Sequence, residues 1–195
     1  MPVALSKGEN VSLTREAPGL TNIIAGLGWN PRETDGEDFD LDASAYLLDA
    51  DGKVPSDADF VFYNNLVSPC ASVVHSGDNL TGGTGGEVAD SEQIKINLMT
   101  LPPVIERIAI CVSIHMAELR QQNFGMVGDA YIRILNERGG AELARFDLSE
   151  DASIETAMIF GELYRYGAEW KFRASAQGFP GGLAELARHF GVNVE

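Results

Sequence analysis

Basic side chains are scarce in this sequence. Its 195 residues include 14 Lys and Arg against 29 Asp and Glu, which gives a formal net charge of −15 at pH 7. Nucleic acids and anionic membrane surfaces are themselves negatively charged, so proteins that bind them electrostatically carry the opposite balance. The composition therefore argues against both as partners.

Cysteine and histidine are also few. Cys70 and Cys111 show no metal-binding spacing, and Cys111 lies in an apolar run, so we expect free thiols rather than a disulfide. The histidines are His75, His115 and His189, and no G-x-S-x-G, H-E-x-x-H or phosphate-binding loop motif is present. We interpret His189 as a surface residue and His75 as a strand-end residue with a structural hydrogen bond. These shortages favour a protein that is not an enzyme.

Long hydrophobic stretches are absent as well. No run approaches the roughly 18 apolar residues that a membrane-spanning helix needs. The first seven residues lack the apolar centre of a secretory signal peptide. We therefore expect a cytoplasmic protein without direct membrane insertion, and the length suits a single domain over 1–195.

Short runs of β-branched and aromatic residues, separated by Gly, Pro, Asn and Asp, dominate the sequence. We expect about ten strands with turns every 8–12 residues, the pattern of an antiparallel β-sandwich with a few short helices and long acidic loops. Val3-Leu5 and Asn10-Leu13 are predicted to form a hairpin. Other strands are predicted at 21–29, 40–48, 59–65, 72–75, 93–98, 107–114, 130–135, 142–147, 156–166 and 169–174, and helices at 116–122 and 182–190.

The segment from Ser76 to Glu92 combines five glycines with many oxygen-bearing side chains and contains no Lys or Arg. It must form a long loop, and such a set of carboxylates, amides and carbonyls suits a hard cation. Ca²⁺ fits better than Mg²⁺, since it accepts six to eight oxygens in irregular geometry. A solvated acidic loop without a metal is the alternative.

A second acidic cluster strengthens the metal hypothesis. Asp38, Asp40 and Asp42 are spaced by two, so in an extended strand they share one face while Phe39, Leu41 and Ala43 point to the core. Like charges aligned on one face repel each other, and a divalent ion relieves this repulsion. The spacing does not match an EF-hand. Carboxylates that share a cation are driven towards ionisation, which does not suit acid–base catalysis.

Several further segments resemble the TerD family of tellurium-resistance and stress proteins. They run in order over essentially the whole chain. They are Gly26-Leu-Gly-Trp29, Phe39-Asp-Leu-Asp-Ala-Ser44, Asp59-Phe-Val-Phe-Tyr-Asn-Asn65, Gly77-Asp-Asn-Leu-Thr-Gly82, Arg120-Gln-Gln-Asn-Phe-Gly125, Glu155-Thr-Ala-Met158, Gly161-Glu-Leu-Tyr-Arg165, Glu169-Trp-Lys-Phe172 and Gly181-Gly-Leu183. The resemblance implies a cytoplasmic bacterial β-sandwich that binds calcium through acidic loops and is linked to resistance to tellurite and other stresses.

The match to the family holds at Asp40, Asp42, Asp78 and Asn79, which implies one calcium site. The stretch from Gly83 to Glu92 is about three residues longer and less acidic than the family's usual glycine loop, and it departs from the pattern for a second site. The predicted ligands are Asp38, Asp40, Asp42, Asp78, Asn79, the carbonyls of Gly83 and Gly85, and Glu87, Asp90 or Glu92.

Three hypotheses follow for the function. The first is a non-enzymatic calcium-binding stress protein that acts through protein partners, such as other Ter-family or stress proteins. The second is a scaffold that assembles with Ter paralogues and holds Ca²⁺ only as a structural ion. The third is a metal-dependent enzyme acting on an oxyanion or a phosphoester.

Overall fold

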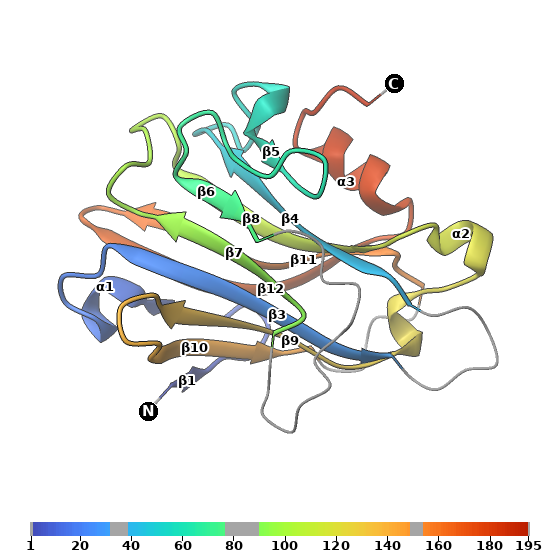
Figure 1. Ribbon diagram of the computed structural model, residues 1–195, viewed down its shortest axis with the longest axis horizontal. Coiled ribbons are helices and arrows are strands. Elements are labelled where there is room, and N and C mark those ends of the chain that lie inside the picture. Colours follow the sequence, from blue (N-terminus) through green and yellow to red (C-terminus); the bar gives the residue numbers. More distant parts are fainter. Residues whose placement is uncertain (1, 32–38, 77–89, 149–153, 195) are drawn as a thin grey trace.

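Two six-stranded β-sheets packed face to face make up the fold (Figure 1). The computed structural model describes residues 2–31, 39–76, 90–148 and 154–194. The strands are β1 (Val3–Ala4), β2 (Asn10–Ser12), β3 (Asn22–Pro31), β4 (Leu41–Leu48), β5 (Phe60–Val61), β6 (Val73–His75), β7 (Glu92–Asn97), β8 (Arg107–Ile114), β9 (Val127–Asn136), β10 (Glu142–Asp147), β11 (Ala157–Tyr166) and β12 (Glu169–Phe179). The helices are α1 (Leu13–Glu16), α2 (Ala117–Arg120) and α3 (Gly182–His189), with 3-10 turns at Asp57–Asp59 and Phe124–Met126.

We call the sheet with strand order β1-β10-β9-β3-β7-β6 sheet A, and the sheet with order β2-β12-β11-β8-β4-β5 sheet B. All strand pairs are antiparallel except β1 with β10. The predicted mainly-β antiparallel sandwich is thus confirmed. Most of the two predicted acidic loops, at 32–38 and 77–89, lies outside the described residues.

The main hydrophobic core fills the space between the sheets. Sheet A contributes residues such as Ile23 and Ile134, and sheet B contributes Leu47, Ile110 and Phe160, all of which are fully buried. Their alternation along each strand gives one apolar face, as period-2 patterning requires.

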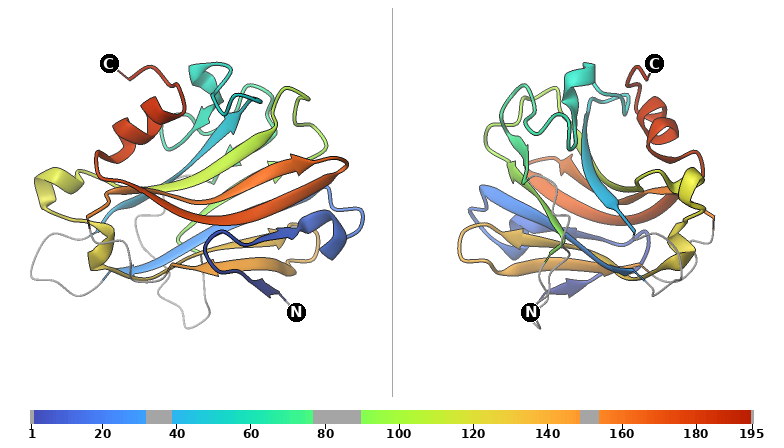
Figure 2. Two further views of the ribbon diagram at one scale, coloured as in Figure 1. Left: turned by 180° about the vertical axis from the view of Figure 1, so that it is seen from behind. Right: turned by 45° about the vertical axis from the view of Figure 1, so that its right-hand side comes forward.

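A second hydrophobic cluster lies on the outer face of sheet B, where α3 packs across the strands (Figure 2). Tyr46 and Leu48 of β4 meet Leu186 and Phe190 of the α3 region there. This cover explains why Tyr46 and Leu48, which point away from the core between the sheets, are fully buried. The helix ends at Gly191, whose positive φ of 85° is the usual helix stop, as predicted.

The predicted N-terminal hairpin is wrong. The chain does turn at residues 7–9, but β1 pairs in parallel with β10 of sheet A, whereas β2 pairs with β12 of sheet B. The turn residues predicted the position of the chain reversal. The sheet that each flanking strand joins is determined by pairing with strands far away in the sequence. Similarly, only Phe60–Val61 of the strand predicted at 59–65 is extended, because the chain turns back on itself between Phe62 and Asn65.

Candidate metal centre

Asp40 and Asp42 lie where the chain enters β4. Leu41 and Ala43 belong to the core between the sheets, so Asp42 and Ser44 face the outer side of sheet B. This is the alternation that the sequence predicted. Asp42 is only 8% exposed, which is unusual for a carboxylate and requires compensating partners.

The neighbouring strand β8 places His115 beside these acids. Asp42 lies opposite Ser113 in the β4–β8 register, so His115, two positions further along, lies beside the N-terminal end of β4. The His115 backbone N–H donates to the Asp40 carbonyl at 2.7 Å, and its Nδ1 lies 3.7 Å from Asp42 Oδ2. The beginning of β4 is therefore held in place on its β8 side.

On its other side, β4 is held by side chains from sheet A. β5 pairs only with Ala45 and Tyr46, so it does not reach the backbone groups of Ala43. The Ala43 N–H donates instead to Glu92 Oε2 at 2.5 Å, and His75 Nε2 donates to the Ala43 carbonyl at 3.0 Å. His75 Nε2 and Glu92 Oε2 are 3.4 Å apart, and both side chains are almost completely buried.

Glu92 begins β7, the strand that follows the glycine loop, and His75 ends β6, the strand that precedes it. Their bonds to Ala43 therefore bring the two ends of that loop against the acidic entrance of β4. The residues that flank the glycine loop therefore lie beside the strand in which the other acidic cluster ends. The structural hydrogen bond predicted for His75 is confirmed.

Asp90 has a different environment from the other predicted ligands. Its side chain is fully buried, and Oδ1 accepts from Arg133 Nε at 2.8 Å and from the Tyr131 hydroxyl at 3.1 Å. Oδ2 accepts from Arg133 Nη2 at 3.2 Å and from Gln93 Nε2 at 3.0 Å. Burial, with the charge and hydrogen bond of Asp90, raises the pKa of Tyr131 to about 12. Both carboxylate oxygens are thus already engaged by donors.

Two glycines of β3 make room for this cluster. A Cβ on Gly26 would lie 2.2 Å from Asp90 Oδ2, and one on Gly28 would lie 2.3 Å from the Tyr131 ring. The sequence indicated that small residues in this strand allow something to pack closely against it, and Asp90 and Tyr131 are the groups that do so. Tyr131 and Arg133 were not predicted as part of any site, because nothing in the local sequence links β9 to the glycine loop.

The structure places four of the predicted ligands, namely Asp40, Asp42, Asp90 and Glu92. Asp38, Asp78, Asn79, Gly83, Gly85 and Glu87 lie outside the described residues. Within the ranges that the structure describes, no three His, Cys, Asp or Glu side chains are grouped so that they could hold a metal ion by themselves. Calcium coordination by the full set remains a prediction.

Two six-stranded, mainly antiparallel sheets packed face to face place this chain in the class of β-sandwich proteins. A family model described as the TerD domain matches residues 1–190, and the chain belongs to this family. The relatives include tellurium resistance protein TerD of Serratia marcescens, which is 54% identical over 194 residues and covers all of both chains. General stress protein 16U of Bacillus subtilis is 52% identical over 195 residues, again over both full lengths.

Solved structures share the fold. The crystal structure of SAV2460, a protein of unknown function, superposes with a TM-score of 0.70 at 23% identity and covers 90% of this chain and 99% of its own. A homologue of telluride resistance protein (TerD), SCO6318 from Streptomyces coelicolor A3(2), gives a TM-score of 0.67 at 24% identity, covering 87% and 96%. Among the described residues, no helix is both long enough and apolar enough to cross a membrane.

Proposed function

We propose that this protein serves in tellurium resistance and the general stress response as a calcium-binding protein that acts by binding rather than by catalysis. Full-length relatives at 54% and 52% identity carry tellurium-resistance and general-stress names. Both cysteines of this chain are free thiols, which favours the cytoplasmic location predicted from the sequence.

The observation that supports the calcium site is the contact between Ala43 of β4 and Glu92 of β7. This contact draws the ends of the glycine loop to Asp40 and Asp42, so oxygens from both acidic clusters can surround one ion. Asp38, Asp40, Asp42, Asp78, Asn79, Glu87 and the carbonyls of Gly83 and Gly85 would hold it. All are hard oxygen donors of the kind that Ca²⁺ prefers.

Asp90 and Glu92 have positioning roles in this proposal. Asp90 is held by Arg133, Tyr131 and Gln93, and it fixes the end of the glycine loop to sheet A. Glu92, the first residue of β7, fixes the start of that strand to sheet B through Ala43. Bound calcium would neutralise the acids at the mouth of β4, and the residues that carry them would then adopt one arrangement.

We propose that a protein partner docks beside this end of the sandwich. Met116 is 52% exposed and Leu119 is 77% exposed, and both belong to the α2 segment directly after His115. Because the His115 backbone is bonded to Asp40, a change at the acids can be transmitted to this segment. A stress protein or Ter-family paralogue that docks here would sense the bound ion.

A calorimetric calcium titration of chelator-treated protein, in physiological Mg²⁺, tests the proposal. We expect one or two ions to bind, with a dissociation constant of roughly 10⁻⁷–10⁻⁵ M if the protein is a sensor. The double variant Asp78→Ala/Asp42→Ala should lose binding. Unchanged stoichiometry in that variant would reject the ligand set, and no heat with the unsubstituted protein would reject calcium binding altogether.

The scaffold hypothesis makes a different prediction about partners. If calcium is only structural, the immobilised protein should retain a partner captured from a lysate at saturating calcium. It should retain the partner equally well when free calcium is buffered to roughly 10⁻⁷–10⁻⁵ M. If calcium acts as the signal, retention should follow occupancy of the site. Replacing Leu119 by Glu should abolish capture in both cases without altering the calcium titration.

A further inference from the structure

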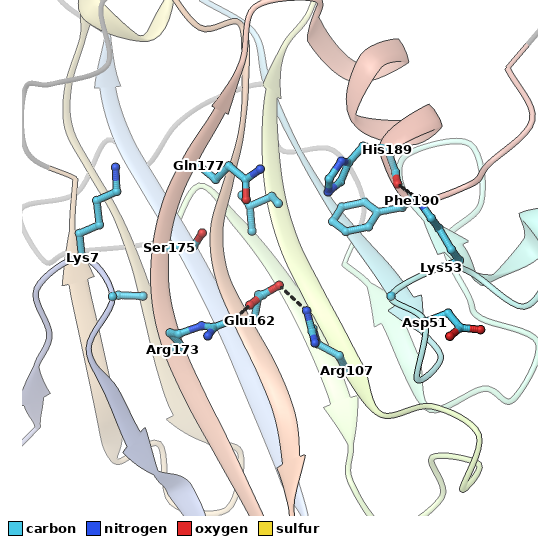
Figure 3. A pocket seen from close by; sticks show the side chains of 14 residues that line it. Lys7, Asp51, Lys53, Arg107, Glu162, Arg173, Ser175, Gln177, His189 and Phe190 are labelled. Atoms are coloured by element: carbon cyan, nitrogen blue, oxygen red, sulfur yellow. Dashed lines mark hydrogen bonds and ion pairs between the residues drawn. The ribbon is translucent and has the colours of Figure 1, made fainter.

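A cavity of about 580 Å³ opens on the outer face of sheet B, away from the acidic end of β4 (Figure 3). Strands β8, β11 and β12 form its floor, the turn at residues 7–8 lies on one side, and the turn at 51–53 and the end of α3 lie on the other. Its volume lies in the range of about 300–1,000 Å³ that is usual for small-molecule sites.

The charge of this cavity is opposite to that of the chain. Lys7, Lys53, Arg107 and Arg173 line it, against only Asp51 and Glu162. Over the whole chain, acids outnumber Lys and Arg by 29 to 14. A net positive cavity in so acidic a protein is not explained by average surface composition, and it favours a negatively charged ligand.

Glu162 of β11 orients two of these cations. Arg107 Nη1 lies 3.4 Å from Glu162 Oε1, and Arg173 Nη2 bonds to Glu162 Oε2. The Glu162 side chain is 10% exposed, whereas those of Arg107 and Arg173 are 41% and 44% exposed. The carboxylate is thus satisfied beneath two guanidinium groups that remain open to solvent.

Each guanidinium has five N–H donors in a fixed plane, and the bond to Glu162 uses only part of them. Within the part of the chain that the structure describes, neither guanidinium has a further hydrogen-bonding partner, although that of Arg173 also lies 5.7 Å from the centre of the Tyr164 ring. The two planar groups lie on either side of the Glu162 carboxylate (Figure 3), and their unused N–H donors are of the kind that binds anionic oxygens.

Lys53 and Lys7 add charge at the rim. Lys53 Nζ donates to the His189 carbonyl at 2.5 Å, which holds it at the C-terminal end of α3. Lys7 has no ion-pair partner among the described residues. Ser175 and Gln177 of β12 supply neutral donors along the same wall (Figure 3).

We propose that this cavity binds a small ligand bearing a multiply charged oxyanion group, with Arg107 and Arg173 gripping the anionic oxygens and Lys53 and Lys7 neutralising the remaining charge. Inorganic phosphate, phosphate monoesters and tellurite share this chemistry. The cavity is larger than a free phosphate requires, so it can also accept the body of a monoester.

The test is isothermal titration of chelator-treated protein with sodium phosphate, phenyl phosphate and sodium tellurite in separate experiments at low salt. We expect saturable one-site binding of at least one probe, weakened by added salt. Preference for phenyl phosphate would identify an esterified ligand, whereas equal or tighter binding of phosphate or tellurite would identify a free oxyanion. Absence of saturable binding by all three would overturn the proposal.

Variants separate a built site from general charge attraction. Arg173→Gln and Arg107→Gln should each weaken binding roughly tenfold or more, because each removes hydrogen bonds from a charged group. Arg173→Lys keeps the charge but loses the planar fork, so its affinity should lie between those of the unsubstituted protein and of Arg173→Gln. Lys53→Gln should weaken binding less.

Arg138→Gln is the matched control, because it changes the net charge equally at an exposed turn that does not line the cavity. Equal weakening in Arg138→Gln and Arg173→Gln would overturn the proposed site. Should Arg173→Gln fail to fold, Arg173→Lys and Lys53→Gln still decide the question. Calcium titration of the same variants should be unchanged, so the outcome is independent of the calcium proposal.

Discussion

Asp42 and Asp90 are both buried carboxylates that the sequence assigned to one metal site, yet the structure treats them differently. Asp90 is surrounded by donors from Arg133, Tyr131 and Gln93, so a permanent cation already neutralises it. Asp42 faces the acidic mouth of β4, with the titratable His115 at 3.7 Å. An acid's neighbours in space, rather than its neighbours in sequence, determine whether it can serve a bound ion.

The largest effect should come from removing the cation that neutralises Asp90. Arg133→Met leaves a buried carboxylate without its charge partner, which should lower the free energy of unfolding by about 3–5 kcal/mol in urea denaturation. Arg15→Met is the control, because the Arg15 side chain is 76% exposed and solvent screens its pair with Glu169, so its loss should change the free energy of unfolding little. Similar losses in both variants would contradict the special role of Arg133.

Calcium affinity should distinguish the two acids directly. Asp42→Asn removes one of the charged ligands proposed for calcium and should weaken calcium binding roughly tenfold or more, each tenfold being about 1.4 kcal/mol. Asp90→Asn keeps much of the hydrogen bonding with Arg133 and should preserve the stoichiometry. If Asp90→Asn loses calcium while Asp42→Asn does not, the proposed ligand set must be reversed.

Substitution of Gly26 should reveal how tightly Asp90 is packed. A Cβ there would lie 2.2 Å from the carboxylate, so Gly26→Ala should destabilise the protein by about 1–3 kcal/mol through overpacking. The double variant Gly26→Ala/Asp90→Ala should be less destabilised than the sum of the single variants, because they share one contact. Strict additivity in thermal or urea unfolding would show that the strain lies elsewhere.

The smallest effect concerns alkaline pH. The pKa of Tyr131 is raised to about 12 by burial and by Asp90, above its ordinary value near 10. A raised pKa in the folded state stabilises the protein below pH 10, and this contribution is lost as the pH rises from about 10 to about 12. Asp90→Asn should shift the Tyr131 transition to lower pH in ultraviolet titration, with Tyr131→Phe identifying its signal.

The elements that the sequence predicted well are those whose own residues determine their environment. The segments 107–114 and 142–147 form strands with the predicted bounds: the first is an apolar run that is buried on both faces of sheet B, and the second contributes Leu143, Ala144 and Phe146 to the core. The helix that ends at Gly191 is likewise local, because a single residue supplies the left-handed stop. The position of His75 and Glu92 beside Ala43 agrees with the expected site, and coordination of one ion by both acidic segments stays a prediction.

What the sequence could not reveal depends on contacts between distant segments. Arg133 lies 43 positions after Asp90, and the two are brought together because β9 and β7 both pair with β3. The positive cavity is assembled from single cations on separate segments, none of which forms a motif by itself. The resemblance to the TerD family identified the fold and the acidic loops, but it did not indicate this cavity.

The first twelve residues fasten the two sheets to each other, since β1 joins residues 144–145 in sheet A and β2 joins residues 171–173 in sheet B. These partner segments are synthesised long after β1 and β2. β1 and β2 must therefore wait until β10 and β12 have been made, and their docking closes the sandwich late in folding. Until they dock, the outer edges of β10 and β12 lack their strand partners and are open to mispairing with other chains.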